Sequence, residues 1–112
     1  MNDASRRFRQ QVIDHVEMLA SLSEQIKYEK DVPIADIPGE LVCIYDELFR
    51  PKSEDFLNAF TEDEIKSLAE LYGMICIASK AFKGKGVVEL QKLPEWRAVV
   101  TFSKDLLVKL VK

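Results

Sequence analysis

The chain is poor in the residues on which many kinds of site depend. It has a single histidine, His15, which excludes a HExxH zinc site and a catalytic pair of histidines. It has 4 glycines and 4 prolines, too few for a turn-dense all-β fold. Its longest uncharged, apolar-rich run, from Leu71 to Ala78, is far shorter than the roughly 20 residues that span a bilayer. These absences favour a helical protein that binds over one that catalyses.

The two cysteines, Cys43 and Cys76, both lie in apolar stretches that read as helix. We expect two buried thiols, with a disulfide as the less favoured alternative. The N-terminal sequence is amphipathic and lacks the continuous apolar core of a signal peptide. We therefore expect a soluble, cytoplasmic protein.

The composition is that of one folded domain. The chain has 112 residues, of which 47% are hydrophobic and 31% charged, so it can bury a core of its own and is not disordered. We expect residues 1–112 to form one all-α domain. Its architecture should be an irregular bundle of four main helices with one or two short ones.

Apolar residues recur at three- and four-residue steps, the spacing of one helix face. The pattern predicts main helices at about 4–29, 38–49, 61–84 and from Pro94 onward. A short helix is expected over 53–60, with Phe56, Leu57 and Phe60 buried. The stretch 87–93 can be a short helix or an extended segment, and we favour the helix. Leu106, Leu107 and Leu110 can bury within the domain or in a dimer.

Several residues mark where helices begin and end. Thr61 and Glu64 have the spacing of a capping box, in which each side chain bonds the other residue's backbone N–H. Pro33 and Pro38 mark a connector, and the glycines at 84 and 86 should end the third main helix. Gly73 inside that helix suggests close approach of another helix, since glycine costs about 1 kcal/mol there relative to alanine.

Charge is distributed unevenly along the chain. The net charge of −3 combines −2 over residues 1–39, −6 over 40–79 and +5 over 80–112. The acidic third supplies the candidate partner-binding residues, which are Asp46, Glu47, Glu54, Asp55, Glu62, Asp63 and Glu64. One explanation is that helix first turns favour negative charge. The other is a surface for a cationic partner, and the two are compatible.

The remaining candidates favour structural roles. Lys83 to Gly86 resembles a phosphate-binding loop only weakly, because it follows a helix and lacks the GxxxxGK spacing. Trp96 near basic residues could stack on a base, but a core position is favoured. His15 is best explained as structural, and Asp46 and Glu47 point about 100° apart on a helix. We expect no catalytic residue, no metal, no cofactor and no enzymatic activity.

One stretch resembles a known family. The residues that carry the resemblance are Glu40-Leu41, then Ile44-Tyr45-Asp46-Glu47-Leu48-Phe49-Arg50-Pro51, then Phe56 and Ala59-Phe60-Thr61-Glu62-Asp63-Glu64. This stretch is similar to small helical immunity proteins of bacterial toxin systems, notably those of contact-dependent growth inhibition. The resemblance covers less than a quarter of the chain. It implies a cytoplasmic protein that binds a cognate toxin domain, often a nuclease, and blocks it without catalysis. It transfers no functional residues.

An acidic surface suits that role, because a nuclease needs a positive cleft to attract phosphate. Tyr45 and Phe49 could be aromatic anchors for such a partner, although core positions are favoured. A helical adaptor or regulatory interaction domain is the alternative function. Nucleic-acid binding through the basic residues 80–112 is a weaker one. The favoured interpretation has a protein partner, with no nucleic acid and no membrane, and the oligomeric state stays open.

Overall fold

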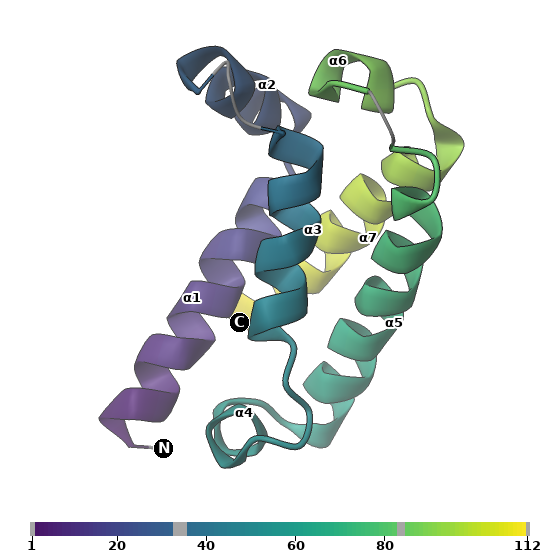
Figure 1. The fold of residues 1–112 in the computed structure, drawn as a ribbon. Helices are drawn as coiled ribbons and strands as arrows, with labels where there is room; N and C mark the ends of the chain where they lie inside the picture. The colour runs from purple at the N-terminus through teal and green to yellow at the C-terminus, as the bar shows by residue number, and fades with distance from the viewer. Residues whose placement is uncertain (1, 33–35, 83–84, 112) are drawn as a thin grey trace.

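A computed structural model describes residues 2–32, 36–82 and 85–111, and this part of the chain is all-α, as predicted (Figure 1). It contains no strand. Its helices are α1 (Asp3–Leu19), α2 (Leu22–Asp31), α3 (Ile37–Leu48), α4 (Glu54–Ala59), α5 (Glu62–Ser79), α6 (Val87–Leu90) and α7 (Pro94–Val111).

The four long helices, α1, α3, α5 and α7, run along the length of the molecule (Figure 1). The short helices close its ends. α2 and α6 contact each other at one end, while α4 packs on the first half of α1 at the other. α7 contacts both α1 and α5, so the C-terminal helix joins the N-terminal helix to the rest of the bundle.

One hydrophobic core runs between the long helices. Its largest fully buried side chains include Trp96, Tyr45 and Phe56. Trp96 therefore has the core position that we favoured over base stacking. Leu106 and Leu110 are buried within the domain. These two residues therefore need no dimer to bury them.

Side-chain caps explain where several helices start. Asn2 caps α1, Asp36 caps α3 by accepting from the Gly39 N–H, and Thr61 with Glu64 forms the predicted capping box of α5. Such a cap satisfies backbone N–H groups that have no partner in the first turn. The helical alternative for 87–93 is also confirmed, because α6 occupies its first four residues.

The prediction of one continuous helix at 4–29 is wrong. The chain breaks at Ala20 and Ser21, where the Ser21 hydroxyl caps α2 by accepting from the Glu24 N–H. The apolar steps of three and four residues continue across the break, so periodicity alone hides it. The bonds of Gln25 to the last carbonyls of α1 hold the break in place.

The third main helix ends earlier than predicted, at Ser79. Tight backbone bonds over 77–82 turn the chain and bring Phe82 edge-on to Trp96, with ring centroids 5.2 Å apart. The helix stop predicted at Gly84 and the connector around Pro33 lie outside the described residues.

Three expectations about side-chain positions are also wrong. Leu57 is 52% exposed, because the short α4 buries its other side through Phe56 and Ala59. Gly73 is exposed, and a Cβ placed there would meet nothing within 4 Å, so no helix approaches it. Cys43 and Cys76 are exposed free thiols on the outer sides of α3 and α5.

Candidate functional site

Most of the predicted partner-binding carboxylates lie toward the end of the molecule that carries α4. α4 and the start of α5 lie at this end, and the last turn of α3 leads down to it through the loop before α4 (Figure 1). Six of the seven predicted carboxylates are exposed at this end. We call these six the acidic end, and they are Asp46, Glu47, Glu54, Asp55, Glu62 and Asp63.

Glu64 is the exception, because its side chain points inward. It is 8% exposed and forms a two-pronged ion pair with Arg9, with both N–O distances at 2.9 Å. The hydrogen bond from Arg9 lowers the pKa of Glu64, and burial opposes this shift only in part. Glu64 also accepts from the backbone N–H of Thr61 in the capping box. Its charge is thus balanced within the fold, and Glu64 does not belong to the acidic end.

Arg9 is a residue that the sequence reasoning missed. Its guanidinium also donates to the carbonyl oxygens of Ala59 at 2.9 Å and Leu110 at 2.7 Å. It lies over the ring of Phe60, 5.2 Å from the centroid. Arg9 therefore fastens α1 to the ends of α4 and α7 and to the start of α5. Arg9 lies on the same helix face as the buried Ser5 and Val12. This position was the only sign in the sequence that its side chain turns inward.

Asp46 is oriented by a neighbouring helix. It accepts a hydrogen bond of 2.6 Å from the hydroxyl of Tyr72 on α5. This bond and the nearby negative charge raise the pKa of Tyr72 to about 12. The pair fixes the carboxylate against α5 and keeps the hydroxyl protonated at neutral pH.

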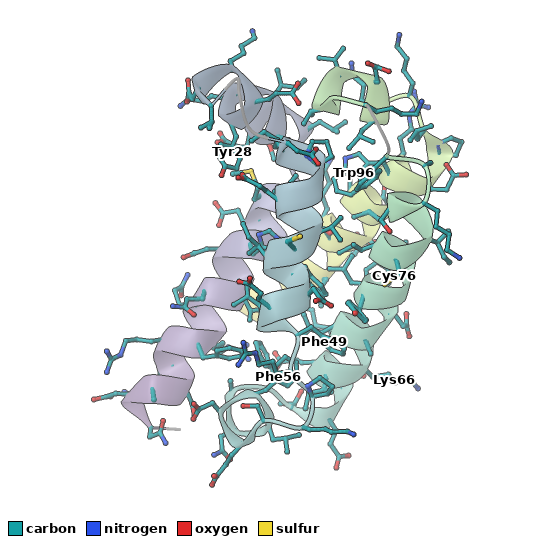
Figure 2. The ribbon with its side chains drawn as sticks, viewed as in Figure 1. Tyr28, Phe49, Phe56, Lys66, Cys76 and Trp96 are labelled. Atoms are coloured by element: carbon teal, nitrogen blue, oxygen red, sulfur yellow. The ribbon has the colours of Figure 1, made fainter. Side chains whose placement is uncertain are left out.

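An aromatic cluster lies beneath the acidic end (Figure 2). Phe49 contacts Tyr72 and Phe56, with ring centroids 5.0 Å and 5.5 Å apart. Tyr45 is fully buried and donates to the Leu68 carbonyl at 2.6 Å, so it packs in the core as favoured. Phe49 is half-buried, which leaves part of one aromatic ring accessible near the carboxylates.

The other acidic groups differ in how far their charge is balanced. Asp63 forms an ion pair with Lys109 of α7, whose ammonium also donates to the hydroxyl of Ser67. Within the described ranges, Glu47, Glu54, Asp55 and Glu62 form no ion pair. The last three occupy helix first turns, where the helix dipole stabilises their charge. Both explanations of the acidic cluster therefore still apply.

Basic residues also lie beside this end. Arg50 follows α3 and donates through its Nε to the carbonyl oxygen of Glu47 at 2.7 Å, and the exposed Lys52 follows it. By contrast, Lys85, Lys92 and Arg97 belong to the opposite end, near α6 and the start of α7 (Figure 1). The uneven charge of the sequence is thus partly retained as a separation in space.

His15 is buried between α1 and α3, with its Nε2 2.9 Å from the carbonyl oxygen of Leu41. Burial lowers its pKa, and the bond to Leu41 opposes the shift. Among the residues that the structure describes, no three His, Cys, Asp or Glu side chains are grouped as metal ligands. No helix in those ranges has the length and hydropathy needed to cross a membrane.

Comparison with known proteins adds nothing to the description of the fold and the site. No protein-family model matches the chain, and neither the curated proteins nor the solved structures give a match.

Proposed function

We propose that the chain is an immunity protein, which binds a cognate bacterial toxin domain in the cytoplasm and blocks it without catalysis. The toxin domain would be cationic, with a nuclease as the favoured kind. The observation that carries the proposal is the acidic end, where three successive chain segments carry six exposed carboxylates. The resemblance of residues 40–64 to immunity proteins agrees with it.

Physical chemistry gives this surface a way to act. A nuclease cleft attracts phosphate through positive charge, and a row of carboxylates can occupy the same cleft. Complementary charge accelerates the encounter and disfavours partners of the wrong sign. Glu47, Glu54, Asp55 and Glu62 are the best placed for this role, because no ion pair within the described ranges reduces their charge. The accessible part of Phe49 supplies an apolar contact beside them.

A rigid base supports the surface. Arg9 and Glu64 hold the start of α5 against α1, and the Tyr72 hydroxyl holds Asp46. Asp46 is thus oriented before binding and loses less side-chain freedom when the partner arrives. The fold also holds the backbone at the start of α5 in place through Arg9 and Glu64.

The test begins with a search of the source genome for a large secreted toxin encoded beside this gene. The toxic domain of that protein is then produced in cells with and without this chain. We expect the chain to rescue growth and to bind the purified domain. The triple variant Glu54→Lys, Asp55→Lys, Glu62→Lys should lose both, with most of the effect in the association rate and strongly dependent on salt.

A matched control changes the same amount of charge elsewhere. The variant Glu17→Lys, Asp31→Lys, Glu70→Lys alters three exposed acids outside the acidic end and should still rescue growth. Circular dichroism shows whether each variant is folded. Rescue that survives the reversal at 54, 55 and 62 overturns the acidic-surface mechanism. Failure of the unaltered chain to bind or protect overturns the immunity function itself.

A further inference from the structure

One face of α7 is exposed along the whole helix. Its exposed side chains recur at steps of three and four residues, so they form a single stripe. The stripe consists of Pro94, Arg97, Ala98, Thr101, Lys104, Asp105, Val108 and Val111. The opposite side of the helix holds the core residues. No helix of this chain covers the stripe in the described ranges.

Beside the stripe lies an apolar groove between α7 and α5. It has a volume of about 520 Å³ and is lined by Met74 of α5 and by Ala98, Thr101 and Phe102 of α7, with Arg97 and Asp105 at its charged margin. A smaller hollow of about 160 Å³ continues it toward Lys109 and shares Phe102 and Asp105 with it. Ile77, three residues beyond Met74, is 61% exposed.

Two charges on this face, Arg97 and Asp105, are complementary to each other. Arg97 and Asp105 are eight residues apart, about 12 Å along the helix, with Thr101 midway. Two copies of α7 laid antiparallel about a two-fold axis at Thr101 bring Arg97 of each copy opposite the partner's Asp105. The same operation places Pro94 opposite the partner's Val108. A parallel arrangement would place like charges together instead.

We propose that this face of α5 and α7 binds a second copy of the chain, with the two α7 helices antiparallel and crossing at Thr101. A closed two-fold dimer requires a surface that matches itself, and the order of Arg97, Thr101 and Asp105 meets this condition. The Nε of Arg97 donates to the Gln91 carbonyl oxygen at 2.7 Å. This bond orients the guanidinium and uses only one of its five N–H groups.

The dimer surface contains none of the six carboxylates of the acidic end. Binding to a toxin and self-association can therefore be tested apart, and either can fail alone. The small side chains of Ala98 and Thr101 at the centre let the two helices approach, while Phe102 and Met74 supply apolar area along the groove.

Sedimentation velocity measures the mass directly. A small interface needs a high protein concentration to dimerise, so the measurement is made at about 0.2 mM. We expect roughly twice the monomer mass of 12.8 kDa there. Arg97→Asp and Asp105→Arg should each raise the dimer dissociation constant about tenfold or more, because each places like charges together twice. The double variant Arg97→Asp, Asp105→Arg should restore the dimer. Arg7→Asp, an exposed arginine of α1, is the matched control and should change nothing.

A second measurement tests the position of the axis. Thr101→Cys, made with Cys43→Ser and Cys76→Ser to remove the exposed native thiols, should form a disulfide between copies under mild oxidation. A monomer at the highest concentration overturns the proposal. So does a dimer that ignores the single charge reversals, or a double variant that stays monomeric while folded by circular dichroism.

Discussion

The indole Nε1 of Trp96 donates a hydrogen bond to the side-chain oxygen of Gln25 at 3.0 Å, and both side chains are fully buried. The amide nitrogen of Gln25 donates in turn to the carbonyl oxygens of Met18 and Leu19, at 3.1 Å and 3.2 Å. A single amide thus satisfies the end of α1 and joins α2 to α7. The break between α1 and α2 depends on this side chain.

Replacing Gln25 with leucine should therefore be strongly destabilising. The change keeps a similar volume but leaves the indole N–H and the Leu19 carbonyl oxygen without this partner, and each buried unsatisfied group costs about 1–3 kcal/mol. We expect the free energy of unfolding, measured in urea, to fall by about 3 kcal/mol. Gln11→Leu on the exposed side of α1 is the control. A loss below about 1 kcal/mol for Gln25→Leu would contradict this role.

The ion pair of Arg9 with Glu64 makes stability depend on pH. The pKa of Glu64 is lowered in the folded state, so its contribution is present above the unfolded pKa and is lost as the pH falls through the folded value. We expect Glu64→Gln to cost about 2 kcal/mol at pH 7, since hydrogen bonds between charged groups are the stronger kind. The difference from the parent chain, measured by urea unfolding, should shrink at pH 3. An equal difference at both pH values would show that charge is not involved.

Local signals in the sequence predicted much of this fold. The capping box of Thr61 and Glu64 was visible because it needs only two residues three positions apart. The core positions of Phe56 and Trp96 followed from apolar residues at helical spacing. The acidic end was predictable as a set of residues because the carboxylates cluster in the sequence before they cluster in space.

Contacts between distant segments were not predictable in this way. Arg9 and Glu64 are separated by 55 positions, and no local spacing links them. Gln25 is a polar residue on an otherwise apolar helix face. That position indicates a buried hydrogen bond, but the sequence does not identify the partner, Trp96. The exposure of Cys43 and Cys76 was missed because each lies in a nearly continuous apolar run, where helical periodicity does not distinguish inside from outside.

His15 should report the stability of the α1–α3 contact as the pH changes. Its pKa is lowered in the folded state by burial, so the folded protein resists protonation more than the unfolded chain does. The free energy of unfolding should therefore decrease as the pH falls below the unfolded value of about 6.5, and this loss should be absent in His15→Gln. Because there is one histidine, NMR titration of its ring follows the folded pKa directly. A ring pKa at or above 6.5 would contradict the expectation.

Two glycines should respond differently to alanine. A Cβ at Gly73 meets nothing within 4 Å, so Gly73→Ala should raise the free energy of unfolding by about 1 kcal/mol through helix propensity alone. A Cβ at Gly39 would clash with the Asp36 side chain and displace the cap of α3. Losing a cap costs about 1 kcal/mol, which offsets the gain in propensity, so Gly39→Ala should leave the free energy of unfolding nearly unchanged. Thermal unfolding followed by circular dichroism measures both, and an equal gain for the two variants would contradict the packing assigned to Gly39.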